Sequence, residues 1–509
     1  MDTTLSDFYD IVSPDAGAMI ETLRAYGYHL ETSVADIIDN SIYARAQNVW
    51  IDCAWDGEKS AISIRDDGHG MTENALKNAM RPGSKNPLQE RDAKDLGRFG
   101  LGLKTASFSQ CRKLMVGSKS EENETVFRCW DLDYVNLCGE WRLVKPNKEN
   151  IPPVFSVLDD MNNGTIVLWE KMDRITKGTD SANKKHKDHF LAQLDIMKKH
   201  LEMVFHRFLV KPRGLKIILN GREIKPWDPF LTNHPSTQHL PQEDILYNGK
   251  KITIRPFVLP HRSKLNDEAY DLAGGPGGWN ERQGFYIYRN ERLIVPGDWL
   301  GLESMKGQPI RKEQFTKLAR IMVDIPNSLD GDWKIDVKKS VARPPNLIKD
   351  DFQRISRLTI DKAISVFRFR GKVSERTSES SITFPWSTSV QHGNYHYSIN
   401  RGHPLVSDIL QNSGESRKKI QAMLRIIEET VPVPLIILNG SNNPDKIQRP
   451  FEGAPSDELK SVLAEIWSSM IKTGVSPETA KLRLIHMEPF SDYPTYVTEF
   501  ILKKDYEVK

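Results

Sequence analysis

The stretch LETSVADIIDNSIYARA, residues 30–46, decides the fold of the first part of the chain. Its apolar residues recur at intervals of three and four from Val34 to Ile42, which is the spacing of a helix with one buried face. Asp36 and Asn40 share a different face of the same helix. A carboxylate and an amide placed side by side in this way indicate a binding face.

A strand and a glycine turn follow in AISIRDDGHGM, residues 61–71. The alternation of apolar and polar residues predicts a strand that ends at Asp66. Gly68 and Gly70 permit the backbone torsions of a sharp turn, which residues with a Cβ resist. The turn should present Asp66 and the backbone near Met71 at the end of the strand.

A glycine-rich loop, GRFGLGLKTAS, covers residues 97–107. Gly97, Gly100 and Gly102 precede a helix that is expected to begin near Leu103. Bare backbone amides ahead of a helix N-terminus form a common phosphate-binding arrangement. The loop therefore predicts contacts to phosphate.

Each of these three patterns is common by itself. An Asp-Asn pair is usually a solvated helix face, Asp-x-Gly-x-Gly is usually a hairpin, and a glycine-rich run is often only a tight loop. Their order within one segment is the informative feature, because together they supply a metal ligand, a base and phosphate contacts. The combination predicts a nucleotide pocket.

At these residues the chain resembles the GHKL ATPase superfamily, which includes DNA gyrase, the heat-shock 90 chaperones, MutL and the sensor histidine kinases. The segment ADIIDNSIYA is most similar to the AELVDNSIDA box of MutL and of the MORC ATPases with their bacterial relatives. The resemblance implies that ATP and Mg²⁺ bind, that Asn40 coordinates the Mg²⁺ and that Asp66 accepts the adenine amino group. Thr165, in NNGTIVLWE, matches the Gly-Thr that helps to hold adenine.

Two residues depart from the family pattern. Asp36 stands where MutL and MORC proteins carry the Glu that activates water, and Tyr43 stands where their box ends in Asp. Asp36 is one methylene shorter, and a misplacement of about 1 Å can cost on the order of 10²-fold in rate. Asp36 is the first candidate for the general base and Asp39 the second, whereas Glu31 lies too far round the helix. The alternative for Asp36 is a metal-orienting role in a site that turns over slowly or not at all.

Residues 72–100 are expected to begin with a short helix capped by Thr72, and a polar run with Pro and Gly follows in the sequence. A run this polar resembles the lid that closes over nucleotide in the superfamily. Ser84, Lys85 and Lys104 are candidate phosphate contacts, and a solvated loop lysine is the alternative for Lys85. The residues expected to contact the nucleotide are Asn40, Asp39, Asp66, Gly68, Gly70, Met71, Ser84, Lys85, Gly97, Arg98, Phe99, Gly100, Leu101, Gly102, Leu103, Lys104, Thr105 and Thr165.

The sequence of residues 113–170 predicts several strands. Apolar, β-branched and aromatic residues predict strands at 113–118, 125–132, 140–144 and 164–170. With the earlier elements they should form a mixed sheet with helices on one face, the α/β sandwich of a Bergerat-type ATP-binding domain. This domain is expected to span residues 1–175.

A second α/β domain is expected at residues 176–350. A basic helix leads into it, two Asn-Gly hairpins follow at 215–224 and 245–254, and further strands lie at 284–295 and 319–326. The domain resembles the ribosomal-S5-like transducer domain of gyrase, MutL and MORC proteins.

The resemblance to a transducer domain implies a lysine on the terminal phosphate. The strand DWKIDVKKSVARPP, residues 332–345, offers Lys339 first and Lys338 second. A cation there would stabilise phosphate charge. The alternative is a lysine pair that protects an edge strand from aggregation.

The rest of the chain is expected to contain a helix and a Ser/Thr-rich linker at 351–391, then a mainly helical C-terminal domain of unknown role at 392–509. The fold class is therefore α+β. The total of 509 residues fits two or three domains.

Composition restricts the function classes only weakly. A formal charge of +3 neither requires nor excludes nucleic acid. The four cysteines show no zinc spacing and no disulfide framework, and no stretch of the sequence is long and apolar enough to span a bilayer. A cytoplasmic location is expected.

The resulting hypothesis is a Mg²⁺-dependent ATPase that forms a homodimer on binding ATP and acts as a clamp. By resemblance the client would be DNA, in a bacterial antiviral defence or repair system with other proteins. The alternatives are a histidine kinase, a chaperone of the heat-shock 90 type, and an ATP sensor that does not hydrolyse its ligand.

Overall fold

The structure is a computed structural model of the chain. It describes residues 14–25, 27–83, 102–121, 123–304, 307–335, 342–368, 385–391, 394–432, 457–472, 474–485, 487, 490 and 494–507. The chain divides into two compact units, Met1–Val373 and Ser374–Lys509.

The first unit opens with a mixed sheet of strand order β4-β3-β5-β2-β1-β6-β7. The β1–β6 pair is parallel, and the other neighbours pair antiparallel. The strands are β1 Asn48–Ala54, β2 Ala61–Asp66, β3 Lys113–Lys119, β4 Val126–Asp131, β5 Gly164–Glu170, β6 Lys216–Leu219 and β7 Arg222–Glu223.

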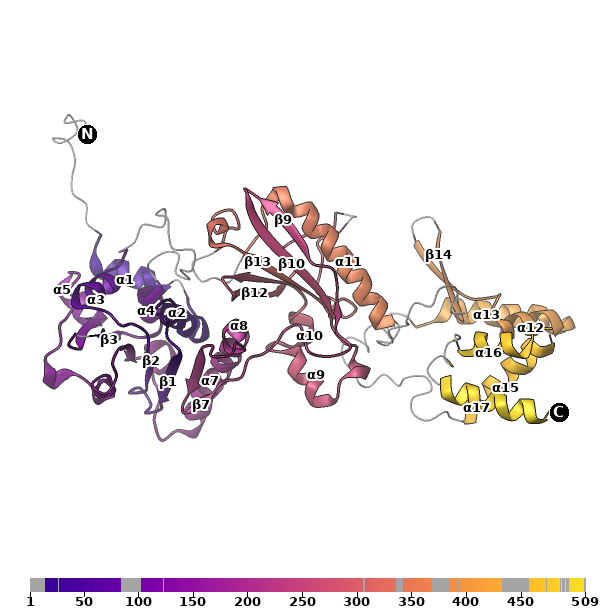
Figure 1. Cartoon of the computed structure of the whole chain (residues 1–509), viewed down its shortest axis with the longest axis horizontal. Helices are drawn as coiled ribbons and strands as arrows, with labels where there is room; N and C mark the ends of the chain where they lie inside the picture. Colours follow the sequence, from indigo (N-terminus) through magenta and orange to yellow (C-terminus); the bar gives the residue numbers. More distant parts are fainter. Residues whose placement is uncertain are drawn as a thin grey trace, which may run out of the picture. The chain divides into compact units, whose positions relative to one another are not determined.

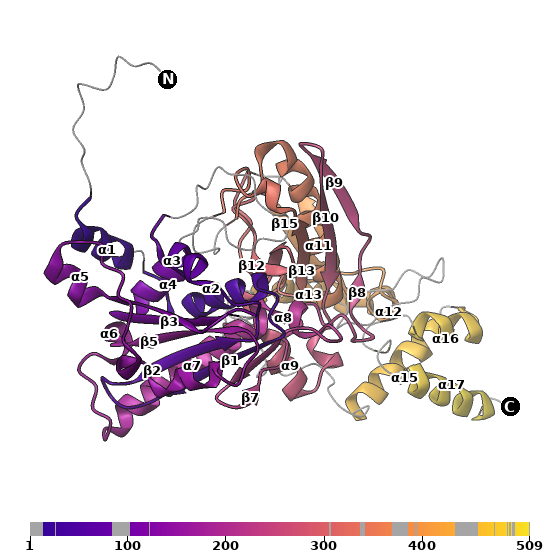
Figure 2. The same cartoon turned by 60° about the vertical axis from the view of Figure 1, so that its left-hand side comes forward.

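Helices α1, α2 and α4 lie on the same side of these strands (Figure 2). The helices of this part are α1 Ala16–Ala25, α2 Leu30–Tyr43, α3 Glu73–Met80, α4 Gly102–Gln110, α5 Leu132–Cys138, α6 Asp173–Thr176, α7 Lys184–Val204 and α8 His206–Leu209, with 3₁₀ turns at Lys148–Asn150 and Pro153–Leu158.

The alternation along the strands explains the two faces of the sheet. Val167 and Trp169 of β5 belong to the main core beneath the helices. Ile166 and Leu168, which point the other way, pack in a smaller cluster with Phe155 of the Pro153–Leu158 turn. The expected sandwich is therefore present, and a short 3₁₀ turn packs on the sheet face opposite the helices.

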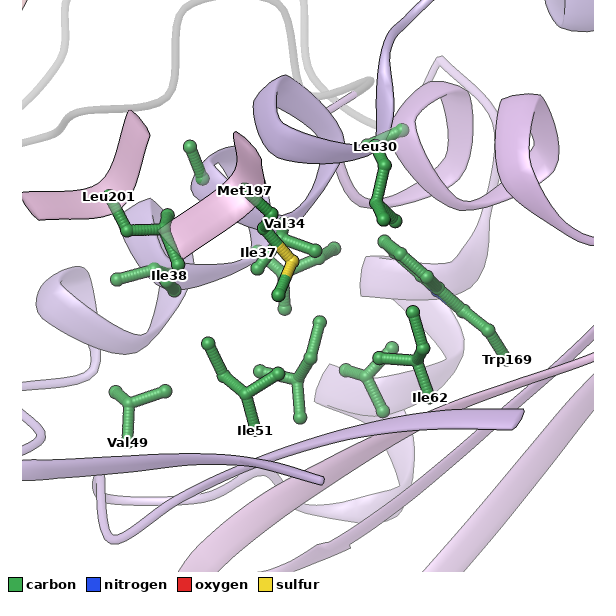
Figure 3. Packing of buried hydrophobic residues seen from close by; sticks show 14 of the residues in the cluster. Leu30, Val34, Ile37, Ile38, Val49, Ile51, Ile62, Trp169, Met197 and Leu201 are labelled. Carbon is green, nitrogen blue, oxygen red and sulfur yellow. The ribbon is translucent and has the colours of Figure 1, made fainter. Parts of the chain in front are cut away.

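Helix α2 is fixed by its apolar face. Val34, Ile37 and Ile38 are almost completely buried over β1 and β2. Met197 and Leu201 of α7 pack against the same face of α2 (Figure 3). Burial of this stripe determines which α2 side chains are left to face other elements.

One expected strand is wrong. Residues 140–144 form no strand, and only Val144 makes an isolated bridge, to Cys129. The backbone turns here, since the Arg142 amide donates to the Glu140 carbonyl. Trp141 instead packs edge-on against Trp130, with ring centroids 6.0 Å apart. Trp141 is aromatic because its side chain covers the edge of the core, and not because it lies in a strand.

The hairpin at 215–224 forms as expected but belongs to the first sheet. Asn220 and Gly221 both have positive φ, as a two-residue hairpin turn requires. Its strand β6 pairs with β1, and α7 packs in the same core. The core of the first sheet thus extends beyond residue 175. No local pattern signals this extension, because pairing partners are set over long range.

The second sheet has the order β12-β11-β13-β10-β8, with β9 also pairing with β10. Helix α11 covers it through Phe352, Ile355 and Ala363 (Figure 1). Its elements are β8 Gln238–His239, β9 Glu243–Tyr247, β10 Lys250–Val258, β11 Gly284–Arg289, β12 Arg292–Asp298, β13 Ala319–Ile325, α9 Asp267–Gly274, α10 Gly278–Glu281 and α11 Lys349–Arg368, with 3₁₀ turns at Arg262–Lys264, Asn327–Leu329 and Asn346–Ile348.

The second unit is mainly helical, and its core lies between α15, α16 and α17. Its elements are β14 Trp386–Gln391, β15 Asn394–Ile399, α12 Pro404–Asn412, α13 Arg417–Thr430, α15 Asp457–Lys472, α16 Pro477–Ile485 and α17 Pro494–Glu507, with a 3₁₀ turn at Gly414–Ser416. The expected α+β fold class with a mainly helical C-terminal region is confirmed. In the part of the chain that the structure describes, no helix has the length and apolar character needed to cross a bilayer.

The burial of α2 gives a test of the fold. Ile38→Ala should destabilise the first sheet by about 2–5 kcal/mol, because Ile38 is fully buried and its removal leaves a cavity. Ile196→Ala on α7, where the side chain is 49% exposed, should change stability by no more than about 0.5 kcal/mol. Hydrogen exchange of peptides covering α2 and β1 measures both. Equal losses from the two changes would contradict this packing.

Candidate nucleotide-binding site

Three polar side chains form a row across three adjacent strands, near one end of these strands, in the first sheet. Asp66 at the end of β2 pairs with Thr165 of β5, and Thr165 pairs with Ser118 of β3. The Ser118 and Thr165 hydroxyls are 2.8 Å apart. Residues from three separate parts of the sequence thus meet at one place.

Asp66 is the ionisable member of this row, and only 7% of its surface is exposed. The Ser41 hydroxyl of α2 donates to its Oδ2 at 2.8 Å, and the Gly68 amide donates to its Oδ1 at 2.9 Å. Burial raises the pKa of Asp66 to about 6, and these two hydrogen bonds oppose that rise. A desolvated carboxylate of this kind is a strong acceptor for a neutral N–H donor.

The turn after Asp66 holds its shape through glycine. Gly70 has φ +65°, and a Cβ there would lie 1.9 Å from the Lys119 carbonyl oxygen. Asn163 donates to the Gly68 carbonyl at 2.7 Å, and the Met71 amide donates to Ser118 Oγ at 2.9 Å. The turn is therefore tied to β3 and to the residue that precedes Gly164.

Asp36 lies beside the start of α4. It is 5% exposed, and a Cβ built on Gly102 would be 3.8 Å from its Oδ2. Gly102 is the first residue of α4, close to the expected start near Leu103. The Asp36 carboxylate therefore lies close to the N-terminal turn of α4. The backbone amides of such a turn point out of the helix.

Asn40 and Tyr43 are exposed on α2, Tyr43 by 47%. Among the described residues, no group of three or more His, Cys, Asp or Glu side chains is placed to hold a metal ion. A site that uses one amide oxygen of Asn40, with phosphate and water oxygens, needs no such cluster. Oxygen donors also suit Mg²⁺. The residues present therefore fit a Mg²⁺ ion that arrives with its nucleotide.

Two of the candidate site residues on α4 are buried in the domain. The Lys104 amine donates to the Ala79 carbonyl of α3 at 2.9 Å, and Lys104 is only 2% exposed. Thr105 is 1% exposed. In this structure Lys104 joins α4 to the end of α3, and its contact to phosphate stays a prediction.

Asp39 faces the second sheet. Its Oδ1 accepts from Arg292 Nε at 3.0 Å, and the two side chains are 2% and 6% exposed. Asp39 is thus engaged by a residue from β12. Its expected nucleotide contact and its rank as second candidate base remain predictions.

Several candidate residues lie outside the described residues: Ser84, Lys85, Gly97, Arg98, Phe99, Gly100, Leu101, Lys338 and Lys339. The structure brings together Asp66, Thr165 and the Gly68–Met71 turn, and it places Asp36 beside Gly102.

Ser41, Ser118 and Arg292 were not predicted from the sequence. Ser41 directly follows Asn40 in the quoted stretch, so its position on α2 was a usable signal. Ser118 and Arg292 depend on strand pairing and on contact between distant elements, and no local pattern marks them.

Residues 28–165 match the family described as Histidine kinase-, DNA gyrase B-, and HSP90-like ATPase. No curated protein sequence matches the chain. Among solved structures, the ATPase and transducer domains of DNA topoisomerase II from Balamuthia mandrillaris match with 12% identity and a TM-score of 0.37, covering 67% of this chain and 85% of that one. The family match and the motifs agree on one segment. Residues 28–165 are therefore similar to this ATPase family.

Proposed function

We propose that the chain binds ATP with Mg²⁺ in its N-terminal domain and hydrolyses it to ADP and phosphate. One observation carries the proposal: Asp66, buried and held by Ser41, lies directly opposite Thr165 at one end of the strands in the sheet that α2 covers. This arrangement suits a base that offers an N–H donor. The family matched by residues 28–165 supports ATP as the nucleotide.

Each residue then has a separate task. Asp66 accepts from the adenine amino group, and Thr165 holds the ring from the neighbouring strand. The amides at the start of α4 receive phosphate oxygens, as helix N-termini do. Asn40 would hold Mg²⁺, which neutralises phosphate charge when bound.

Asp36 is the proposed general base. It takes the proton of the attacking water as the water oxygen bonds to the γ-phosphorus and the bond to the β-phosphate oxygen breaks. Its position beside Gly102, at the start of α4, supports this assignment. As an Asp, it reaches less far than the Glu of MutL and MORC proteins, so we expect slow turnover.

We further propose that the chain is a nucleotide-gated dimeric clamp related to MutL and MORC ATPases, with DNA as client in bacterial defence or repair. Lys339 or Lys338 would meet the terminal phosphate. The exposed Lys184, Lys185 and Lys187 of α7 would favour DNA phosphates. Salt-dependent binding of the full chain to duplex DNA supports this client, whereas binding of unfolded proteins alone supports the chaperone alternative.

Asn40→Ala should weaken ATP binding in Mg²⁺ at least about tenfold, because it removes the proposed oxygen ligand. Asn40 is exposed, so the protein should still fold. Asn136→Ala, an exposed asparagine on α5, is the control and should bind normally. Calorimetric titration with and without a chelator measures the effect. Unchanged Mg²⁺-dependent affinity in Asn40→Ala would refute the metal assignment.

Asp36→Asn should keep ATP affinity within about threefold and lower kcat by about 10² or more, since a positioned base contributes 10²–10⁴-fold. It should also retain an ATP-bound dimer that wild type resolves by hydrolysis. Phosphate release and light scattering measure the two effects. Normal turnover in Asp36→Asn would show that another group is the base. Dimerisation of wild type without any phosphate release would support the ATP sensor.

The raised pKa of Asp66 predicts that both the stability of the protein and its affinity for ADP change with pH. Its folded pKa of about 6 lies above 3.8, so the proton is held more tightly in the folded protein. Relative to Asp66→Asn, wild type should therefore lose stability as pH rises from 4 to 7, by roughly 2 kcal/mol. A donor from adenine favours the ionised carboxylate, so ADP affinity should rise over this range in wild type more than in Asp66→Asn. Calorimetric titration with ADP at pH 5 and 7.5 measures this difference in affinity between wild type and Asp66→Asn. Equal changes of affinity in the two proteins would show that adenine binds elsewhere.

A further inference from the structure

The tip of the β11–β12 hairpin reaches helix α2. Its turn residues Asn290 and Glu291 have φ of 47° and 68°, the left-handed torsions of a tight two-residue turn. The flanking residues Arg289 and Arg292 pair across the turn. A turn this short places both arginines at fixed positions.

Ion pairs anchor the tip on three sides. Arg289 binds Asp330 within the second sheet domain, with Nε 2.8 Å from Oδ2. Glu291 pairs with Lys211, which follows α8. The Arg292 side chain extends from β12 of the second sheet to Asp39 of α2, and its Nε lies 3.0 Å from Asp39 Oδ1. The hairpin is therefore held to its own domain by Arg289 and to the nucleotide domain by Arg292.

The Arg292–Asp39 pair is buried and directional. Arg292 Nη1 donates to the Leu293 carbonyl at 2.7 Å, and its guanidinium carbon lies 4.6 Å from the Phe205 ring centroid. These contacts fix the plane of the guanidinium group. A buried pair tolerates little displacement, because separating its charges leaves each of them desolvated.

A neighbouring histidine adds no charge to this pair. Burial, and to a smaller extent the charge of Arg292, lower the pKa of His200 to about 3. His200 Nε2 is buried and has no hydrogen-bond partner in the described part of the chain. The imidazole is thus neutral at physiological pH.

Asp39 lies on the same turn of α2 as Asp36 and Asn40, the proposed base and metal ligand. A helix is stiff over one turn, so a pull on Asp39 moves all three residues together. Both α2 and β12 also pack against α7. A displacement of the hairpin is therefore transmitted through these contacts to the α2 residues that are proposed to face the nucleotide.

We propose that Arg292 is a positioning residue for ATP hydrolysis. Through Asp39 it sets the rotation and axial position of α2, so that hydrolysis depends on where the second sheet domain lies. This inference rests on the proposed ATPase function. In this proposal Arg292 acts only through α2.

The test compares Arg292→Gln with Arg289→Gln in the full chain. Both changes remove a buried arginine from the same hairpin, but only Arg292 binds α2. We expect Arg292→Gln to lower kcat about tenfold or more while ATP affinity changes less than threefold. Arg289→Gln should lose thermal stability to a similar extent and keep kcat within about twofold of wild type.

Two further variants separate positioning from folding. Arg292→Lys keeps the charge beside Asp39 but loses the planar fork, so its kcat should lie between those of Arg292→Gln and wild type. It carries the test if Arg292→Gln does not fold. In Asp39→Asn/Arg292→Gln no charge is left unpaired, so its kcat should exceed that of Arg292→Gln.

Wild-type kcat in Arg292→Gln, or in Arg292→Lys where only that variant folds, would overturn the inference. An equal loss of kcat in Arg289→Gln would overturn it as well. A wild-type chain that binds no ATP, by contrast, would defeat the proposed function itself, and the two failures are therefore distinguishable.

Discussion

The packing of α2 on the first sheet is the constraint on which the site depends. Its apolar stripe is buried against β1, β2 and α7, so the rotation of the helix is fixed. That rotation directs Asp36 toward the start of α4, Ser41 toward Asp66 and Asp39 toward Arg292. A helix turned by one residue would place none of these side chains where they now lie.

The same helix joins two environments with different physical roles. On one side, Asp66 is desolvated at the end of β2 and would recognise a neutral base in our account. On another side, Asp39 and Arg292 form a buried pair with the second sheet domain. Because both sides belong to one short helix, ATP hydrolysis and the position of the second sheet domain are physically linked in our account.

Local patterns in the sequence predicted much of the fold. The period of α2, the alternation that ends β2 at Asp66 and the Asn-Gly turns at 220 and 248 are confirmed, because each depends on neighbouring residues. The strand expected at residues 140–144 is wrong, since in the sequence an aromatic side chain that covers the edge of a core looks like one in a strand. The place of β6 beside β1 and the partner of Asp39 could not be read from the sequence, because both depend on contacts between segments far apart in the chain.

The most direct test of the account is a crystal structure of the full chain with Mg²⁺ and a non-hydrolysable ATP analogue. We predict adenine against Asp66 and Thr165, and phosphate oxygens at the amides that begin α4. The metal ion should lie on Asn40. A nucleotide bound in a different cavity, or an empty site at saturating analogue, would contradict the central claim.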